Sequence, residues 1–158
     1  MLALTACSGT GDVEPARDAG VSSPFTAQAG FGRLTFEPIT GTETLPLIVG
    51  PQGGGALGGY HIWTAVRMID IRVDEIDAIK VTLTTTSGVQ QSEVIRRPDG
   101  LPFDVCDGAI CAAGFAPRLM DCCQVSDGCV VIGVEVTAKD GRTSSDEATT
   151  GVEACPPC

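Results

Sequence analysis

Histidine is nearly absent from this chain, because His61 is the only one in 158 residues. Any Ser-His-Asp or Cys-His mechanism would have to use His61, and a metal site with two histidine ligands is excluded within one chain. The sequence contains no Gly-x-Ser-x-Gly motif. Hydrolysis by two carboxylates stays open, because 20 acidic residues always offer pairs. We therefore expect a protein that is not an enzyme and uses no cofactor.

Basic residues are also scarce. Lys and Arg number 10 against 20 Asp and Glu, which gives a net charge of −10 and a pI near 4.3. Such a chain is repelled by phosphate groups unless its basic residues cluster, and they are scattered. Nucleic acid is therefore excluded as a partner. The apolar residues form only short runs, none near the roughly 18 residues that span a bilayer, so we expect that the mature chain does not cross a membrane.

Cysteine, in contrast, is abundant, with eight residues of which seven follow position 105. This density is unusual for a reducing cytosol, so we expect disulfides and an oxidising compartment. Seven is an odd number, and each choice of the unpaired residue leaves about 15 pairings, so the connectivity stays open. The predicted disulfide cysteines are Cys106, Cys111, Cys122, Cys123, Cys129, Cys155 and Cys158.

A metal or redox site built from these cysteines is the alternative. Zinc needs four thiolates in a tetrahedral array, and the adjacent pair Cys122 and Cys123 suits that arrangement poorly. Cys155 and Cys158 have the spacing of a redox pair, but such pairs take their low pKa from a helix N-terminus that the sequence does not predict here. We expect no metal. A small thiol- or metal-dependent envelope protein that uses the cluster between Cys106 and Cys158 stays the runner-up.

The first residues indicate a location. Leu4-Thr5-Ala6-Cys7 resembles the lipobox of bacterial lipoproteins, in which a small residue precedes the cysteine that is lipidated. The resemblance implies that residues 1–7 are a truncated signal and that Cys7 carries acyl chains such as palmitate. It also implies the outer membrane, because Ser8 is not the aspartate of an inner-membrane retention signal. Residues 8–30 are rich in Gly, Ser, Pro and Ala without a strand or helix period, which predicts a flexible linker.

Two segments show the alternation of half-buried strands. In residues 78–85 and 130–137 every second residue is apolar, and many are β-branched. Asp140-Gly141 follows the second segment and predicts a hairpin with a primed turn, because such turns require positive φ angles. Weaker alternation predicts more strands, near residues 34–36, 45–49, 60–68 and 69–73. The helical expectations are one turn at 74–78 and a short helix at 112–121.

The apolar share of 43% predicts a folded domain. Many short strands with Gly- and Pro-rich turns predict an all-β fold, an immunoglobulin-like antiparallel β-sandwich with a disulfide-rich insertion. Residues 130–149 resemble the last hairpin of bacterial immunoglobulin-like domains. The predicted divisions are a β-sandwich at 31–152, a Cys-rich insertion at 99–129 within it, and a Cys-Pro-Pro-Cys tail at 153–158.

The glycine-rich segment 50–59 is the most distinctive part of the sequence. Gly50-Pro51-Gln52-Gly53-Gly54, followed later by His61, resembles a Gly-Pro-Gln-Gly-Gly-x-His segment of myxobacterial-type lipoproteins, with extra residues before the histidine. These lipoproteins have no assigned activity, so the resemblance implies location and fold only. The segment lacks the Lys-Ser/Thr of a P-loop, and we interpret it as a flexible crossover between strands.

The strand at 60–68 would separate two sets of side chains. Ile62, Val66 and Met68 share one face, and His61, Trp63, Ala65 and Arg67 share the other. If the first face is the core, His61, Trp63 and Arg67 form an exposed stripe that would stack on a sugar or anchor a partner protein. We favour the alternative that Trp63 is buried like the core tryptophan of immunoglobulin domains.

These observations predict a class and a location more firmly than a ligand. We expect a non-catalytic envelope lipoprotein, attached to the outer membrane by its lipid anchor, that acts as a structural or binding module. Its expected partner is an envelope protein or a glycan.

Overall fold

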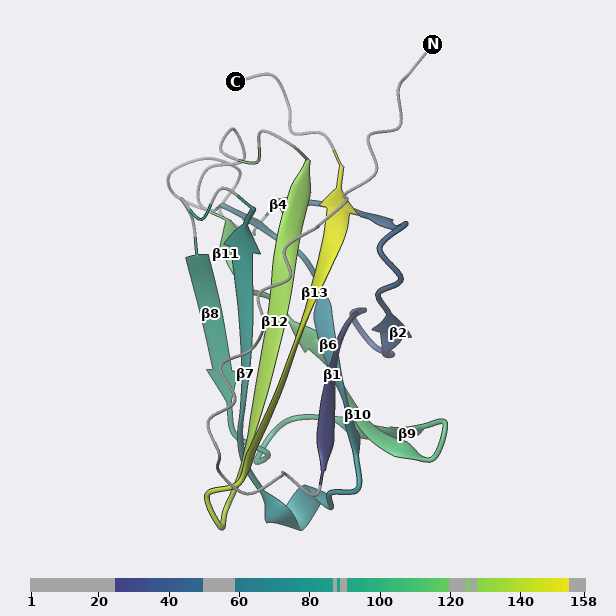
Figure 1. Ribbon diagram of the computed structural model, residues 1–158, viewed down its shortest axis with the longest axis vertical. Coiled ribbons are helices and arrows are strands. Elements are labelled where there is room, and N and C mark those ends of the chain that lie inside the picture. Colours follow the sequence, from purple (N-terminus) through teal and green to yellow (C-terminus); the bar gives the residue numbers. More distant parts are fainter. Residues whose placement is uncertain are drawn as a thin grey trace, which may run out of the picture.

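The computed structural model describes residues 25–49, 59–86, 88, 91–119, 125 and 128–153. This part of the chain forms an all-β sandwich of two five-stranded sheets with a small three-stranded sheet beside them (Figure 1). The β1 sheet has the order β2 (Glu37–Pro38), β1 (Thr26–Phe31), β6 (Thr64–Ile69), β10 (Ala109–Phe115) and β9 (Phe103–Cys106). The β12 sheet has the order β3 (Thr44–Leu45), β13 (Thr143–Val152), β12 (Cys129–Ala138), β7 (Ile76–Thr85) and β8 (Gln91–Arg96). The third sheet contains β11 (Arg118–Leu119), β5 (Tyr60–His61) and β4 (Ile48–Val49), and a single 3₁₀ turn, η1, spans Val73–Glu75.

The strand order is that of an immunoglobulin fold. Strands β1, β6, β10 and β9 occupy the order A-B-E-D in one sheet, and β13, β12, β7 and β8 occupy the order G-F-C-C′ in the other. These strands also follow one another along the chain in the order A, B, C, C′, D, E, F and G of the immunoglobulin fold. The predicted fold class is confirmed. The region 99–129, predicted as a Cys-rich insertion, supplies β9 and β10 to the β1 sheet itself.

The two strongly alternating segments form adjacent central strands. β7 and β12 pair antiparallel, with Val81 opposite Val134, and the predicted inward side chains are buried on both strands. Together with Ile62, Val66 and Met68 of the predicted inward face, they form one continuous core. Burial of β-branched side chains between two sheets is the main stabilising contribution in such a sandwich.

The linker predicted at residues 8–30 overlaps the first strand. Residues 25–30 were assigned to it, yet β1 begins at Thr26, and Phe25, Ala27 and Ala29 belong to the core. This segment alternates with a period of two, but its inward side chains are small, and Ala and Gly favour strands only weakly. Gly30 has a steric role, since a Cβ there would overlap the ring of Phe36, which folds back over β1.

The helix predicted at 112–121 is wrong. This segment is strand β10, followed by the two residues of β11. A short run of small apolar residues fits a buried strand and a buried helix equally well, and pairing with β6 and β9 decides between them. A bulge at Gly114, where φ is +81°, shifts the register by one residue.

Other local predictions also differ in detail. Residues 34–36 form a loop, and the strand predicted at 60–68 is divided into β5 and β6. At 69–73 the chain turns instead of continuing as a strand, because Asp70 has a φ of +62°. The helical turn predicted at 74–78 is the earlier and shorter η1.

A hairpin forms at the predicted Asp140-Gly141 pair, but the primed turn lies at another Asp-Gly pair, Asp107-Gly108. The β9–β10 hairpin has the two-residue loop Asp107-Gly108, and both φ angles are positive, as in a primed turn. At Asp140-Gly141, where the primed turn was predicted, only Gly141 has a positive φ. The N–H of Ala138 donates to the carbonyl of Arg142, so this loop is longer and ends in a glycine of left-handed conformation.

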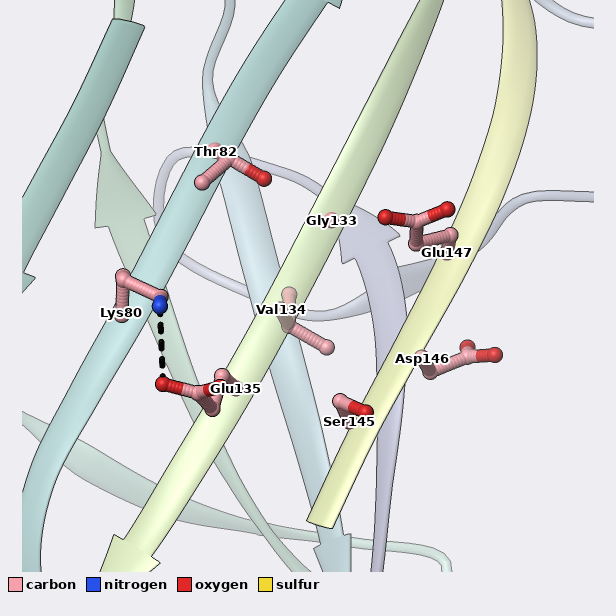
Figure 2. A pocket seen from close by; sticks show the side chains of 8 residues that line it. All are labelled: Lys80, Thr82, Gly133, Val134, Glu135, Ser145, Asp146 and Glu147. Carbon is pink, nitrogen blue, oxygen red and sulfur yellow. Dashed lines mark ion pairs between the residues drawn. The ribbon is translucent and has the colours of Figure 1, made fainter. Parts of the chain in front are cut away.

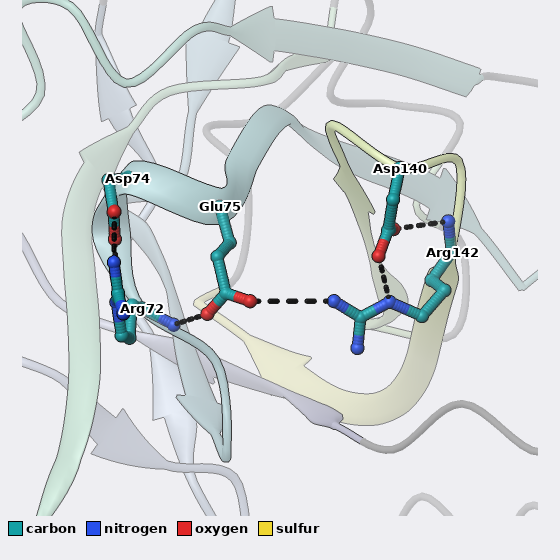
Figure 3. A network of polar contacts seen from close by, with 5 residues as sticks. All are labelled: Arg72, Asp74, Glu75, Asp140 and Arg142. Atoms are coloured by element: carbon teal, nitrogen blue, oxygen red, sulfur yellow. Dashed lines mark hydrogen bonds and ion pairs between the residues drawn. The ribbon is translucent and has the colours of Figure 1, made fainter.

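Charged side chains close the η1 end of the sandwich (Figure 3). Arg142 on the β12–β13 turn pairs with Asp140 at 2.5 Å and with Glu75 of η1 at 3.6 Å. Its guanidinium also lies over the ring of Phe25, 5.6 Å from the centroid. Phe25, the residue just before β1, is therefore held against this cluster.

Candidate functional site

Trp63 lies in a cluster of rings and charges at the start of β6. The rings of His61 and Trp63 meet edge to face, with centroids 4.8 Å apart, and the guanidinium of Arg33 lies 5.4 Å from the Trp63 ring centroid. The Trp63 carbonyl accepts the Gly32 N–H at 3.0 Å, which holds the Arg33 loop beside it. Trp63 is half-buried and lies outside the core. The favoured interpretation, a core tryptophan of the immunoglobulin type, is therefore wrong.

His61 is positioned as a packing residue of the third sheet. It pairs with Ile48 on one side and Arg118 on the other in the third sheet. Burial, and then the nearby charge of Arg118, lower the pKa of His61 below its ordinary value of 6.5. Its Nε2 atom is buried and has no hydrogen-bond partner within the described part of the chain. Nothing in this arrangement orients His61 toward a nucleophile.

Arg67 lies apart from the other two residues of the predicted stripe. It is opposite Cys111 in the ladder of β6 and β10, and its Nη2 donates to the Asp107 carbonyl at 3.3 Å. Its side chain is thus directed along the sheet to the β9–β10 turn, while its buried Nε lacks a partner among the described residues. The structure brings His61 and Trp63 together with Arg33, a residue the sequence did not single out.

The cysteines that fall in described segments are in disulfides. Cys106 and Cys111 are bonded to each other across the β9–β10 hairpin, with Cα atoms 6.0 Å apart, and Cys129 is also disulfide-bonded. Cys7, the other predicted disulfide cysteines and the glycine-rich segment 50–58 lie outside the described residues. Within the described segments no group of three or more His, Cys, Asp or Glu side chains is placed to hold a metal ion.

An apolar groove on the outer face of the β1 sheet was missed by sequence reasoning. Its volume is about 320 Å³, with one wall formed by the loop 34–36 and the other by residues 102–106. The outward side chains of Cys111 and Ala113 on β10 form the floor. Leu34 on the loop wall is 82% exposed, more than any other large apolar residue in the described chain. Val105 of β9 is 76% exposed, but it lies opposite Ile110 and so on the other face of the hairpin from Cys111. Large apolar side chains gathered at a groove mark binding surfaces in soluble domains.

Charged groups of both signs surround this groove. Of the described residues that line it, Asp104 alone is charged. Asp107 follows the lining residue Cys106, and exposed Glu37 follows Phe36. Arg33 precedes Leu34 and Arg67 lies opposite Cys111, and their contacts with Trp63 and the Asp107 carbonyl leave both positive charges in place. The groove therefore combines apolar walls with mixed charges at its rim.

A second, larger hollow lies on the outer face of the β12 sheet (Figure 2). Gly133 has no side chain between Thr82 and Glu147, and this absence makes the depression of about 610 Å³. Lys80 Nζ lies 2.8 Å from Glu135 Oε1, and this contact raises the pKa of Lys80. The Lys80–Glu135 pair cancels its own charge, Asp146 and Glu147 leave the lining with a net negative charge, and Val134 is the hollow's one large apolar residue among those described. It is a weaker candidate than the groove.

No protein-family model matches the sequence, and no curated protein is significantly similar to it. No helix in the described segments is long and apolar enough to cross a membrane.

Proposed function

We propose that this chain is a non-catalytic envelope lipoprotein whose β-sandwich binds a partner protein through the groove on the outer face of the β1 sheet. The lipid on Cys7 tethers the domain to the outer membrane. The sandwich acts as a rigid support for the groove, and no bond is made or broken there.

One observation carries the binding function. Leu34 is 82% exposed on one wall of the groove, and Val105 is 76% exposed on β9, the strand that bounds the groove on the other side; these are the two most exposed large apolar side chains of the described residues. Exposure of both residues to water is unfavourable by roughly 25 cal/mol for each Å² of apolar surface. A partner that covers them recovers this free energy, and such central apolar anchors contribute most of the affinity in protein interfaces.

The location rests on two independent features. The lipobox at Leu4-Thr5-Ala6-Cys7 supplies a lipidation site, and the Cys106–Cys111 disulfide fits an oxidising compartment outside the cytosol. Residues 8–24 separate Cys7 from Phe25. Their Gly-, Ser- and Pro-rich composition predicts a flexible linker, and a random coil of that length would span about 20–25 Å, so the domain would stay near the membrane.

A protein partner fits the chemistry better than a glycan. Sugars bind by stacking on an open aromatic face and by many hydrogen bonds, but Arg33 covers Trp63 and His61 contacts its edge. The side chains of Thr35 and Asp104 are the polar ones among the described residues that line the groove. Apolar side chains of a protein are the natural complement of the remaining lining.

Photo-crosslinking in intact cells tests this proposal. A benzophenone amino acid is placed at Leu34 or Asp104, which lies opposite Cys111 on the groove face, and the matched control carries it at Ile95, which is 58% exposed on the β12 sheet. We expect a discrete covalent adduct from positions 34 and 104 and none from position 95. Equal labelling from all three positions, or no adduct from any, would contradict a partner at the groove.

A further inference from the structure

We infer that the Cys106–Cys111 disulfide is a site of thiol–disulfide exchange whose substrate is the thiolate of an incoming cysteine. The thiolate attacks Cys106 Sγ, a mixed disulfide forms there, and Cys111 leaves as a thiolate. A second thiolate then attacks the substrate sulfur and releases Cys106. Two substrate thiols are thus oxidised to one disulfide, and their two electrons and two protons convert the bridge to two thiols. Partner binding at the groove breaks no bond, and the exchange is a separate reaction that does not depend on it.

The bridge lies where a second thiol can reach it. Both cysteines line the open groove, and the β9–β10 hairpin that carries them is at the periphery of the sandwich (Figure 1). Cys106 is partly exposed on β9, the edge strand of the β1 sheet in the described part of the chain. Cys111 on β10 is only 3% exposed. An incoming thiolate therefore reaches the sulfur of Cys106, and this direction of attack makes Cys111 the leaving group.

Opening the bridge leaves the fold in place. The disulfide closes one hairpin with a sequence separation of 5, and it does not connect the two sheets. Strands β9 and β10 are also paired along residues 103–112, and neither cysteine belongs to the core cluster. The reduced hairpin therefore keeps its backbone ladder and its place beside β6. Exposed disulfides of this kind are the labile ones in secreted proteins.

A positive charge lies beside the leaving sulfur. Arg67 on β6 is directly opposite Cys111 in the ladder, and its Nη2 donates to the carbonyl of Asp107, the residue after Cys106. The guanidinium thus extends along the sheet from the Cys111 end of the bridge toward the Cys106 end. Its buried Nε is a donor without a partner among the described residues. A cation next to a thiolate stabilises it and makes it a better leaving group.

Asp104 acts on the same sulfur with the opposite sign. It lies opposite Cys111 on the β9 side, and its Oδ1 accepts the Val105 N–H at 2.8 Å. A carboxylate disfavours a thiolate beside it. Arg67, Cys111 and Asp104 form one row across three strands, so each charge can be removed separately and should change the exchange rate in its own direction.

Mass spectrometry of the oxidised, full-length chain tests the inference. The protein is mixed with reduced glutathione or with a neutral capped alanine-cysteine-alanine peptide, quenched with acid at intervals, and mapped by digestion. We expect the first adduct on Cys106, with Cys111 as the free thiol and the disulfide of Cys129 intact. A faster reaction with the peptide would support exchange and identify protein cysteines as the substrate, and a faster reaction with glutathione would support exchange with small thiols.

Charge variants test the assignment of the leaving sulfur. Arg67→Gln should slow formation of the peptide adduct about two- to fivefold, as the loss of one partly exposed charge contact implies. Asp104→Asn should accelerate it by a similar factor. Arg33→Gln removes a positive charge beside the same groove, away from Cys111, and should leave the rate nearly unchanged.

Three results would overturn the inference. If neither thiol reacts unless denaturant is added, the bridge is structural only. If the first adduct is on Cys111, or if Arg67→Gln and Arg33→Gln slow the reaction equally, the assigned direction of attack is wrong. Crosslinks from positions 34 and 104 do not require the disulfide to react, so partner binding and exchange can each fail without the other.

Discussion

The backbone N–H of Ala29 donates a hydrogen bond to Oδ2 of Asp146, 2.8 Å away, and so connects β1 of one sheet with β13 of the other. The Ala27 N–H makes the equivalent bond to Ser144 Oγ at 2.9 Å. β1 pairs along its length with β6, whereas β2 pairs only with its last two residues. Side chains of β13 thus satisfy the backbone donors that β1 presents at its open edge, and they close the sandwich there.

Asp146→Ala should destabilise the domain by about 1–3 kcal/mol, because the Ala29 N–H would remain partly buried without its acceptor. Asp146→Asn retains an oxygen acceptor and should cost less. Urea denaturation measures the difference, with Glu147→Ala as the control on the exposed face of the same strand. Equal losses for Asp146→Ala and Glu147→Ala would show that this edge contact contributes nothing.

The inward and outward faces of β12 should respond differently to charge. Val134→Asp places an unpaired carboxylate at a buried position and should unfold the domain, since the cost of several kcal/mol is comparable to a total stability of about 5–15 kcal/mol. Glu135→Lys removes the partly exposed ion pair between Glu135 and Lys80 and should lower the stability by about 1 kcal/mol or less. Circular dichroism with thermal melting distinguishes them, and similar melting temperatures for both variants would mean that the faces are reversed.

Glu43 should titrate at an unusually low pH. The Thr40 hydroxyl and the N–H groups of Thr40 and Gly41 donate to its carboxylate and lower its pKa from 4.5 to about 2. Because the folded pKa is the lower one, this stabilising contribution is present above about pH 4.5 and is lost as the pH falls toward 2. An NMR titration of the side chain should show this midpoint, and Thr40→Val should raise it. A midpoint near 4.5 in both proteins would refute the assignment.

The Cys106–Cys111 disulfide should stabilise the wall of the groove. Its sequence separation is 5, and a loop of this size contributes about 2 kcal/mol by restricting the unfolded chain. Replacing both cysteines with alanine should lower the melting temperature, whereas EDTA should leave it unchanged. If EDTA lowers the melting temperature and the double replacement does not, the thiol- and metal-dependent alternative is favoured instead.

The fold was predictable where side chains are large and alternate. β7 and β12 have apolar residues, most of them β-branched, at their inward positions, and that pattern has no helical interpretation. β1 and β10 were not predicted, because Ala27, Ala29 and Ala112 give their inward faces little pattern and their pairing with β6 is a tertiary effect. The primed turn at Asp107 was missed for a related reason, since the four Asp-Gly pairs of the sequence look alike until the ladder register is known.

The candidate site was predictable only in part. His61 and Trp63 were identified because histidine and tryptophan are rare in this chain, and they do contact each other. The groove was not found, because the loop 34–36 and residues 102–106 are far apart in the sequence and border one groove only through the strands between them. The short strand β9 shows no clear period in the sequence, and its place is visible only once its pairing with β10 is known.

Membrane partition of a Cys7→Ser variant tests the central claim most directly. The chain is expressed behind a complete lipoprotein signal, with Ser8→Ala as the matched control, and cells are separated into membrane and soluble fractions. We expect the control to remain with the outer membrane, and the Cys7→Ser domain, folded and disulfide-bonded, to appear in the soluble envelope fraction. Unchanged membrane partition of the Cys7→Ser variant would contradict the account of this chain as a lipid-anchored envelope module.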